Sequence, residues 1–241
     1  MSKIALFGYG KMGKAIERIA LSRGHHICAR INDGTETDPW EEADVIIDFS
    51  LPEVAFGNIE KGLTAGIPVI SGTTGWLDRY EEALELCQQQ KGAFLYASNF
   101  SLGVNLFFAL NSYLAQLMGA RKEYRAELSE THHIHKLDAP SGTAITLAED
   151  LIKHTDYTGY SLVEEGKHPD NSRDLPIRAY REGEVPGTHH LTYSSEVDQV
   201  ELIHTAHNRD GFALGAVIAA EWIQGKSGVF TMKDVLNLPS S

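Results

Sequence analysis

Side chains able to do chemistry are densest in residues 130–144, Glu-Thr-His-His-Ile-His-Lys-Leu-Asp-Ala-Pro-Ser-Gly-Thr-Ala. Three histidines and a lysine lie within five positions, 132–136. Histidine can change its protonation state near neutral pH, and lysine adds a positive charge. The next polar residues, Ser141-Gly142-Thr143, can start a helix and offer a hydroxyl and free amide groups to an anion. The segment therefore predicts a site that binds a carboxylate and supplies a proton.

Two other interpretations of this segment stay open. Clustered histidines are common zinc ligands, but His132 and His133 are adjacent and would point apart on a strand, and no cysteine is near them. The cluster could also be a solvated surface feature without a function. We predict acid-base chemistry and no metal.

A glycine-rich loop, Gly8-Tyr9-Gly10-Lys11-Met12-Gly13, follows the apolar run Lys3 to Phe7. In a GxGxxG loop the glycines allow a tight turn and close approach, so that the amide groups at the start of a helix can bind a pyrophosphate. Such a turn can also be purely structural. Its place between a strand and a helix near the N-terminus favours dinucleotide binding.

Three further strand ends carry small polar residues where ligands of doubly wound sheets bind. At the first, Asn32-Asp33, a carboxylate would accept from the ribose hydroxyls and repel a 2′-phosphate, which favours NADH, although Lys11 could offset this. The others are Asp48-Phe49-Ser50 and residues 71–75. The plainer interpretation of Ser50 and Thr74 is that they cap helices.

The elements that must position these loops follow from the hydrophobic pattern. Five apolar runs alternate with segments of helical spacing: Lys3 to Phe7, Ile27 to Ile31, Val45 to Phe49, Val69 to Ser71 and Phe94 to Ala97. Continuous apolar runs are typical of strands covered on both faces, so we predict an α/β fold with an N-terminal doubly wound, Rossmann-like parallel sheet.

The pattern changes after residue 100. Residues 101–120 have the spacing of one long helix, 141–154 that of another, and 155–173 are polar and predict a loop. Residues 124–130, 191–197 and 200–206 alternate, which predicts a second, α+β domain. Residues 211–224 return to a helical pattern. We therefore predict a dinucleotide-binding domain, 1–101 plus 210–241, and a substrate-binding and oligomerisation domain, 102–209.

Composition narrows the function further. The 241 residues are 42% hydrophobic and carry a formal net charge of −12, which argues against nucleic acid as a partner. No run reaches the roughly 20 apolar residues of a spanning helix, and no signal peptide is evident, so we expect a cytoplasmic protein without a membrane partner. Cys28 and Cys87 lack CxxC spacing and are expected to be reduced.

The chain resembles the 4-hydroxy-tetrahydrodipicolinate reductase, or dihydrodipicolinate reductase, family of the diaminopimelate and lysine pathway. The matching blocks cover most of the chain: GYGKMG at 8–13, DFS at 48–50, SGTTG at 71–75, SNFSLGVN at 98–105, ETHHIHKLDAPSGTA at 130–144 and HTAHNRDGFALGA at 204–216. The HHxxKxDAPSGTA run is the most specific of them.

The resemblance implies a role for each matching residue. His132 would be the catalytic proton donor or acceptor and Lys136 a second proton donor. Substrate would bind to His133, Ser141, Gly142 and Thr143. The cofactor, NADH or NADPH, would contact Gly8, Tyr9, Gly10, Lys11, Met12, Gly13, Asn32, Asp33, Gly72, Thr73, Thr74, Ala97, Ser98, Asn99 and Phe100. Family members often have Glu, sometimes followed by Arg, at the position of Asn32, so Asn32-Asp33 leaves the choice of cofactor open.

The reaction implied by the resemblance is hydride transfer to C4 of a cyclic imine dicarboxylate, loss of the 4-hydroxyl as water, and protonation at C3. The resemblance also implies domain closure and a homotetramer formed through the second domain's sheet. Two rivals differ in class. Another two-domain reductase, such as an amino-acid dehydrogenase, would not need the DAPSGTA run, and a dinucleotide-sensing binding protein would not need His132 and Lys136.

Overall fold

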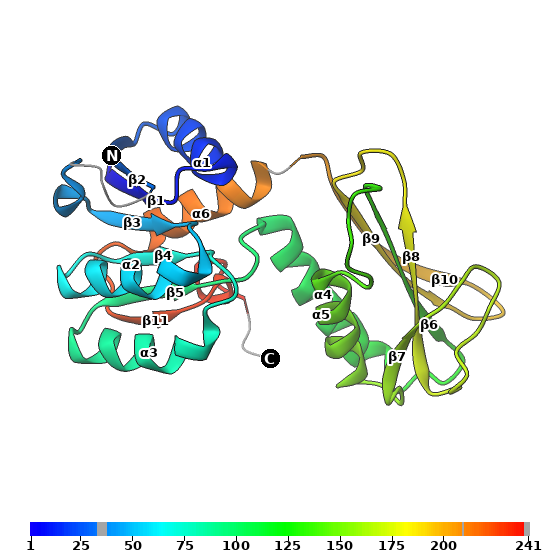
Figure 1. The fold of residues 1–241 in the computed structure, drawn as a ribbon. Coiled ribbons are helices and arrows are strands. Elements are labelled where there is room, and N and C mark those ends of the chain that lie inside the picture. The colour runs from blue at the N-terminus through cyan, green and yellow to red at the C-terminus, as the bar shows by residue number, and fades with distance from the viewer. Residues whose placement is uncertain (33–37, 209, 239–241) are drawn as a thin grey trace. The chain divides into compact units, whose positions relative to one another are not determined.

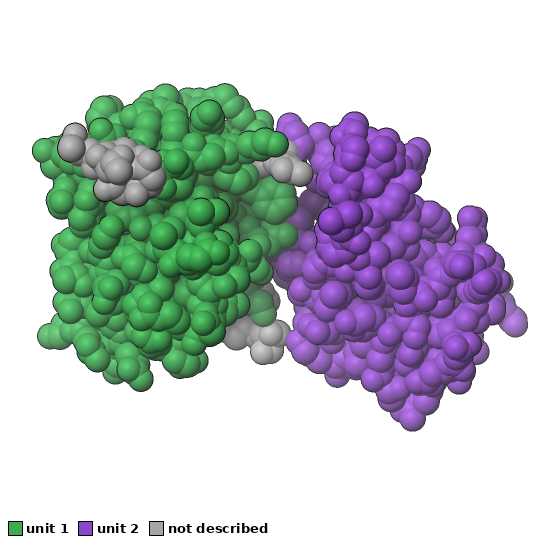
Figure 2. Space-filling view, viewed as in Figure 1, with its two compact units in different colours: residues 1–102, 210–240 green, residues 103–209, 241 purple. Residues whose placement is uncertain are grey.

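The computed structural model describes residues 1–32, 38–208 and 210–238. The chain forms two compact units, shown in different colours in Figure 2: unit 1, Met1–Leu102 with Asp210–Ser240, and unit 2, Gly103–Arg209. The sequence-based prediction ended the first part of the dinucleotide-binding domain at residue 101 and began its second part at residue 210.

Unit 1 is built on a six-stranded sheet in which every pair of neighbouring strands is parallel (Figure 1). The strand order is β11-β5-β4-β3-β1-β2. From β1 the chain moves outward to β2 and then crosses back to β3 on the other side of β1. The carboxyl ends of β1 and β3 therefore border the point where ligands bind in such sheets. The strands are β1 (Lys3–Phe7), β2 (His26–Ile31), β3 (Val45–Asp48), β4 (Val69–Ser71), β5 (Ala93–Tyr96) and β11 (Gly228–Phe230).

Helices cover both faces of this sheet. One apolar core lies under α1 (Lys11–Ser22), α6 (Asp210–Ile223) and α7 (Met232–Val235). The other lies under α2 (Pro52–Thr64) and α3 (Tyr80–Gln89). Two short 3₁₀ turns, η1 (Trp40–Glu42) and η2 (Leu77–Arg79), complete the described elements of this unit. Because both faces are dry, the strands are continuously apolar, which is the pattern that predicted them.

The predicted doubly wound fold is confirmed, with one strand added. The helix predicted over residues 211–224 is α6, Asp210–Ile223, which packs in unit 1. The strand that follows it was not predicted. That strand, β11, contains only Gly228, Val229 and Phe230 and pairs with β5. β11 is an edge strand without a buried residue, so it has no continuous apolar run of the kind that predicted the other strands.

Unit 2 holds a mixed five-stranded sheet of order β10-β9-β6-β8-β7. Strand β6 lies in the centre, antiparallel to β9 and parallel to β8. The strands are β6 (Arg125–His132), β7 (Gly159–Leu162), β8 (Asp174–Arg181), β9 (Gly187–Ser194) and β10 (Gln199–Ala206). A second α+β domain, as predicted, follows the first fold.

The core of unit 2 lies between one face of this sheet and two helices, α4 (Leu102–Met118) and α5 (Gly142–Ile152). Leu147 and Leu151 of α5 meet Leu128 and Ile177 of the sheet. The expectation of a loop over 155–173 is wrong for β7, which lies within it. That strand is at the sheet edge and has no buried residue, so its sequence carries no apolar alternation.

Within the part of the chain that the structure describes, no helix is both long enough and apolar enough to span a membrane.

Candidate functional site

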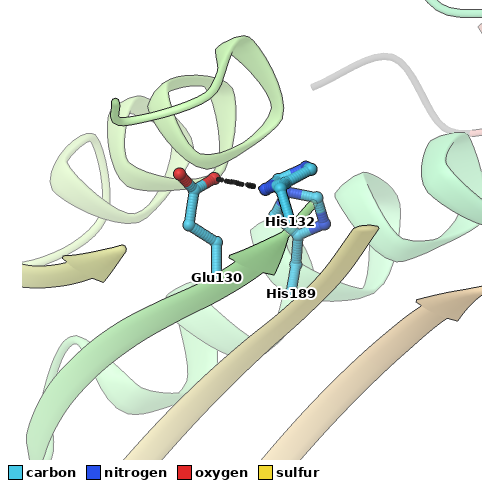
Figure 3. Close-up of side chains that lie close together, drawn as sticks. All are labelled: Glu130, His132 and His189. Carbon is cyan, nitrogen blue, oxygen red and sulfur yellow. Dashed lines mark ion pairs between the residues drawn. The ribbon is translucent and has the colours of Figure 1, made fainter. Parts of the chain in front are cut away.

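The centre of the unit 2 site is the carboxyl end of β6, where Glu130 and His132 point to the same face (Figure 3). Residues two apart on a strand share a face, and alternate residues of β6 are buried against the helices. Glu130 is 1% exposed and His132 is 7% exposed. Across the ladder, Glu130 faces His189 of β9, which is also buried. A carboxylate and two imidazoles thus share one dry pocket.

Glu130 is held by contacts from three sides. The backbone N–H of Ser141 donates to both of its oxygens, at 3.0 and 3.2 Å. Nε2 of His189 lies 3.6 Å and Nδ1 of His132 3.7 Å from Oε2. On the other side, Nη1 of Arg181 lies 3.7 Å from Oε1. The buried carboxylate is therefore compensated by a cation and hydrogen bonds, as a buried charge must be.

These surroundings shift two pKa values. Burial lowers the pKa of His132 to about 4, and the charges of Lys136 and Arg181 act in the same direction, while Glu130 opposes them. Burial raises the pKa of Glu130, but hydrogen bonds from His189 and Ser141 and the charge of His132 lower it by more, so the net shift is downward. At neutral pH the pocket therefore contains a carboxylate beside a neutral His132.

Glu130, His132 and His189 also bring one possible metal ligand each within 4.8 Å of the others. Two features of this pocket oppose a cation. The Arg181 guanidinium already approaches Glu130, and the positive field of Lys136 reaches His132. These positive charges favour proton transfer over metal binding as the role of the cluster. The absence of a metal stays a prediction.

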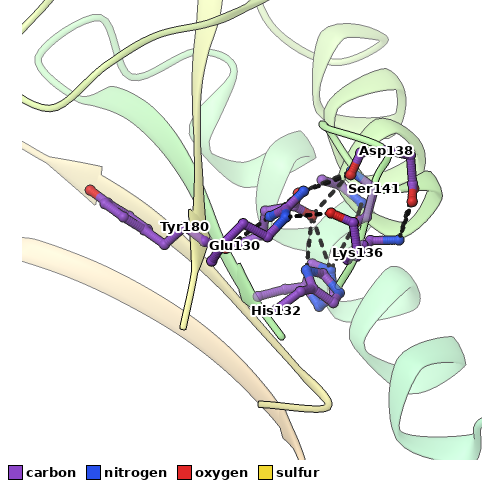
Figure 4. A network of polar contacts seen from close by, with 9 residues as sticks. Glu130, His132, Lys136, Asp138, Ser141 and Tyr180 are labelled. Atoms are coloured by element: carbon purple, nitrogen blue, oxygen red, sulfur yellow. Dashed lines mark hydrogen bonds and ion pairs between the residues drawn. The ribbon is translucent and has the colours of Figure 1, made fainter. Parts of the chain in front are cut away.

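The loop that follows β6 carries Lys136 and Asp138, which pair at 2.7 and 2.8 Å (Figure 4). Arg181 of β8 fixes this loop, because its Nε donates to the carbonyl of Lys136 at 3.2 Å and its Nη2 to the carbonyl of Asp138 at 2.6 Å. The Lys136 side chain is 20% exposed and that of Asp138 61%. Arg181 thus places the Lys136 ammonium beside the His132 pocket.

The loop ends at the start of α5, which has the features of an anion site. Ser141 is the N-cap, and its Oγ accepts from the N–H of Ala144 at 3.2 Å and contacts Nε2 of His189 at 3.2 Å. No acidic residue is in the first turn. A Cβ added at Gly142 would meet nothing within 4 Å, so the described residues leave space for a methyl group in the first turn of α5. Helix and loop together present positive charge and N–H donors.

His133 is the first residue after β6. Its Nδ1 is buried and has no hydrogen-bond partner among the residues that the structure describes. A buried nitrogen of this kind is costly unless a ligand or water satisfies it.

In unit 1 the glycine-rich loop fits a dinucleotide on three separate counts. Gly8 has φ +90°, and a Cβ there would lie 2.0 Å from the carbonyl oxygen of Phe49, so only glycine allows this turn. A Cβ at Gly13 would lie 2.4 Å from the carbonyl oxygen of Gly8, so glycine lets α1 pack closely. At Gly10, the N-cap of α1, a Cβ would meet nothing within 4 Å, and no side chain caps the helix. These are the three roles of glycine in a pyrophosphate-binding loop.

The neighbouring strand ends are tied together by Asp48, which is fully buried at the end of β3. Its oxygens accept from Ser50 Oγ at 2.6 Å and from Thr73 Oγ1 at 2.7 Å, and Asn58 and Ser71 donate as well. Burial, the largest cause, raises the pKa of Asp48 against these hydrogen bonds. Helix capping by Ser50 and Thr74 is wrong, because neither α2 nor η2 has a side-chain cap.

The predicted cofactor residues after β4 and β5 differ in what they can offer. Thr73 is 5% exposed and its hydroxyl is engaged by Asp48, whereas Thr74 is exposed. The side chain of Phe100 is buried, and a Cβ at Gly215 of α6 would meet the Phe100 carbonyl at 1.7 Å. Residues 97–100 are therefore anchored through Phe100, whose side chain and carbonyl group are both packed inside unit 1.

A cavity of about 310 Å³ opens beside this loop, lined by Gly8, Asn32, Val54, Gly57 and Lys61 among others. Asn32 Oδ1 accepts from the N–H of Tyr9 at 3.4 Å, which connects the end of β2 with the loop. Asp33, the other residue predicted to contact the ribose, lies outside the described residues. Lys61 was missed by sequence reasoning, because it follows the strand ends by more than ten residues.

Family models decide what kind of protein this is. The model described as dihydrodipicolinate reductase, N-terminus, matches residues 2–100, and the one described as dihydrodipicolinate reductase, C-terminus, matches residues 103–236. The chain belongs to the dihydrodipicolinate reductase family. The predicted family and enzyme class are confirmed. Reductases of this family use NADH or NADPH and act in the route to diaminopimelate and lysine.

Individual relatives agree with this family. A 4-hydroxy-tetrahydrodipicolinate reductase of Christiangramia forsetii is 50% identical over 237 residues, which are 97% of each chain. One of Archaeoglobus fulgidus is 39% identical over 202 residues, 81% of this chain and 76% of its own. Among solved structures, a dipicolinate-bound dihydrodipicolinate reductase from Paenisporosarcina sp. has a TM-score of 0.77 at 21% identity and covers 96% of this chain and 97% of its own. That likeness confirms the fold.

Three residues of the candidate site at the end of β6 were not predicted from the sequence: Glu130, Arg181 and His189. Glu130 had a signal, since Glu-x-His on a strand puts both side chains on one face. His189 and Arg181 had none, because they come from β9 and β8 and meet β6 only through strand pairing.

Proposed function

We propose that this reductase acts on 4-hydroxy-tetrahydrodipicolinate through the pocket at the end of β6, with His132 and Lys136 as its acid-base residues. Unit 2 would bind the substrate and unit 1 the dinucleotide. The single observation that carries the proposal is the buried group of Glu130, His132 and Ser141, which joins an imidazole to the start of α5. The segment 130–144 thereby folds into one site.

The two carboxylates of the substrate fit the charges of this site. The amide groups of Gly142 and Thr143 and the Thr143 hydroxyl would receive one carboxylate, and His133 would contribute its buried Nδ1 side. Lys136 would release Asp138 and pair with the second carboxylate of the substrate. That exchange is inexpensive, because an ion pair with an exposed partner such as Asp138 is worth only about 0–1 kcal/mol.

The protonation state of His132 follows from its surroundings. Before substrate binds it is neutral at pH 7, since burial holds its pKa at about 4. A dianionic substrate nearby would raise that pKa, as any negative charge does. His132 would then take up a proton when the substrate arrives and release it to the ring carbon, while Glu130 stabilises the imidazolium.

In unit 1 the residues around Gly8, Gly10 and Gly13 would hold the pyrophosphate, and those at Gly72, Thr74 and 97–100 the nicotinamide half. The bound dinucleotide supplies a hydride to the substrate. The role of unit 1 is to fix its position through the amide groups at the start of α1.

We also propose that the protein is a homotetramer and that it is located in the cytoplasm. No helix of unit 2 covers the face of the five-stranded sheet opposite α4 and α5 among the described residues, and Ile203 on β10 is 57% exposed there. A homotetramer formed through this face would bury it. A biosynthetic reductase that depends on NADH or NADPH is expected in the cytoplasm.

The test measures turnover and dinucleotide binding in the same variants. His132→Ala should lower kcat about a hundredfold or more, because general acid-base groups contribute that much. Lys136→Ala should lower kcat and raise KM. Substrate is generated in the assay by the preceding synthase, and NADH oxidation is followed by absorbance. The affinity for NADH, measured by fluorescence, should stay within about twofold in both variants.

Three outcomes would overturn the proposal. Near-normal turnover of His132→Ala would remove the acid-base assignment. Loss of wild-type activity on treatment with a chelator, restored by one added metal, would instead make Glu130, His132 and His189 a metal site. If the wild-type chain binds NADH but turns over no substrate, the rival dinucleotide-sensing protein is correct.

A further inference from the structure

A second cavity in unit 2 lies at the other end of β6, near Arg125. It has a volume of about 320 Å³ and is walled by the segment after α4, the segment after α5 and the ends of β6 and β9. Strand β6 has eight residues, so the cavity and His132 are about 23 Å apart at ~3.3 Å per residue. The reductase site described above does not use this cavity, which we call the distal cavity.

The charge of the distal cavity is opposite to that of the chain. Four cationic residues line it, Arg121, Lys122, Arg125 and Arg173, against one acidic residue, Asp156, whereas the whole protein carries a formal charge of −12. A local excess of positive charge in an acidic protein concentrates anions.

Two of these cations are already committed and two are not. Lys122 forms an ion pair with the Asp156 carboxylate, and Arg173 donates to the Asp156 carbonyl at 3.5 Å. In contrast, the side chains of Arg121 and Arg125 have no hydrogen bond or ion pair within the described ranges. Two guanidinium groups are therefore available to a ligand in the cavity.

A buried hydroxyl in the wall supplies a second, independent observation. Tyr193 lines the cavity and is 2% exposed, and its hydroxyl has no hydrogen-bond partner among the described residues. The neighbouring Tyr157 does not satisfy it, because that hydroxyl is used by the N–H and carbonyl of Ala126, at 3.0 and 3.2 Å. Burial raises the pKa of Tyr193, so its hydroxyl keeps its proton and can donate. An unpaired buried hydroxyl is expected to have a ligand or water beside it.

We propose that the distal cavity is a binding site for a small oxyanion, with Arg121 and Arg125 as its charge partners and the Tyr193 hydroxyl as a hydrogen-bond donor. Guanidinium groups bind carboxylate and phosphate oxygens in the same bidentate way. The volume accommodates a small organic anion such as a dicarboxylate, and it also accommodates inorganic phosphate. Binding here is independent of the function proposed for the β6 carboxyl end.

The plainer explanation is that solvent satisfies all of these groups. Cations also stabilise the carboxyl ends of helices, and both α4 and α5 end near this cavity. That role accounts for Lys122, which donates to the carbonyl of Gly119 at the end of α4, at 3.4 Å. It does not account for Arg125, which belongs to β6, or for the Tyr193 hydroxyl.

The test titrates the intact protein with malonate and, separately, with inorganic phosphate, at constant ionic strength kept by chloride. Calorimetry reports the affinity and stoichiometry, and the unfolding temperature provides a second readout. The variants are Arg121→Ala with Arg125→Ala, which removes both charges, and Tyr193→Phe, which removes only the hydroxyl. Lys153→Ala is the matched control, since it removes one positive charge from unit 2 outside the cavity.

We expect saturable anion binding to the wild type and to Lys153→Ala, with one site per chain that depends on Arg121 and Arg125. The double arginine variant should bind about tenfold more weakly or worse, and Tyr193→Phe severalfold more weakly, as expected for loss of charge-assisted hydrogen bonds. Tighter binding of malonate than of phosphate would identify carboxylates as the ligand class, and the reverse would identify phosphates. Absence of saturable binding to the wild type, or equal affinity in the double arginine variant, would overturn the proposal.

Discussion

Glu130 and His189 face each other across the β6–β9 ladder, and Nε2 of His189 lies 3.6 Å from Oε2 of Glu130. The same oxygen lies 3.7 Å from Nδ1 of His132, so one carboxylate serves two imidazoles whose rings are 5.2 Å apart. Because Glu130 is almost fully buried, its charge acts on His132 with little screening by water. We infer that Glu130 is a positioning residue that sets both the orientation and the proton affinity of His132.

The first prediction tests this role with Glu130→Gln, which keeps the shape and removes the charge. Glu130 raises the pKa of His132, so the variant should show a pKa for His132 still lower than the present value of about 4. Turnover should fall by about tenfold or more while NADH affinity is kept. The pKa is measured by NMR titration of the imidazole proton.

The control for that variant is Glu127→Gln on the same strand. Glu127 pairs with Arg178 at 2.9 Å on the other face of the sheet, away from His132. It should leave both the His132 titration and turnover unchanged. An unaltered His132 titration in Glu130→Gln would show that the carboxylate has a structural role alone.

How far the sequence could predict this site depends on whether its parts are near in the chain. The loop from His132 to Thr143 and the glycine-rich loop were found because each is local, with its chemistry set by adjacent residues. His189 and Arg181 could not be found, since only the register of β9 and β8 against β6 brings them to Glu130. The strands of unit 1 other than β11 were predictable because burial on both faces leaves an apolar run, whereas the edge strands β7 and β11 have no buried residue and no such run.

The second prediction concerns stability and pH. The pKa of His132 is lower in the folded protein, about 4, than the ordinary value of 6.5, so the unfolded chain binds more protons between these values. The stabilising contribution is therefore complete above pH 6.5 and is lost as the pH falls from 6.5 towards 4. The loss amounts to about 3 kcal/mol at most, since each pKa unit corresponds to about 1.4 kcal/mol.

The measurement is urea unfolding of the wild type and of His132→Gln at several pH values from 7 to 4. The glutamine variant should lose less stability over this range, because the group that titrates has been removed. Groups away from His132 contribute equally to both proteins and cancel in the comparison. The contribution of Glu130 cancels only in part, because the charge of His132 helps to lower its pKa. Parallel curves for the two proteins would contradict the prediction.

The third prediction distinguishes a glycine needed for ligand binding from a glycine needed for packing in the glycine-rich loop. Gly10→Ala adds a methyl group into open space, so stability should change by less than about 0.5 kcal/mol, as at other uncrowded sites. The same methyl group would occupy the space that a pyrophosphate needs, and NADH affinity should fall about tenfold or more. Thermal unfolding and fluorescence titration report the two effects.

Gly13→Ala is the counterpart of Gly10→Ala, because its main expected effect is on stability and its effect on NADH affinity follows from that. Its Cβ would lie 2.4 Å from the Gly8 carbonyl, so the start of α1 must shift, at a cost of about 1–3 kcal/mol as for other overpacked sites. Weak NADH binding by this variant would accompany a lower unfolding temperature. If Gly10→Ala bound NADH as tightly as the wild type, the loop would not be the pyrophosphate site.

The last prediction concerns the choice between NADH and NADPH. Lys61 of α2 lines the cavity that also holds Gly8 and Asn32, and its side chain has no hydrogen bond or ion pair within the described part of the chain. If the adenine ribose lies at Asn32, the Lys61 ammonium would meet a 2′-phosphate, whereas NADH has only a hydroxyl at that position. Lys61→Ala should therefore weaken NADPH about fivefold, the value of one exposed charge contact of about 1 kcal/mol, and leave NADH within about twofold. Lys11→Ala, in the glycine-rich loop, tests the alternative cation that the sequence suggested. Fluorescence titrations with both dinucleotides decide between them: an equal loss for NADH and NADPH in Lys61→Ala would exclude Lys61 as a selectivity residue, and a selective loss in Lys11→Ala alone would assign the 2′-phosphate contact to the loop.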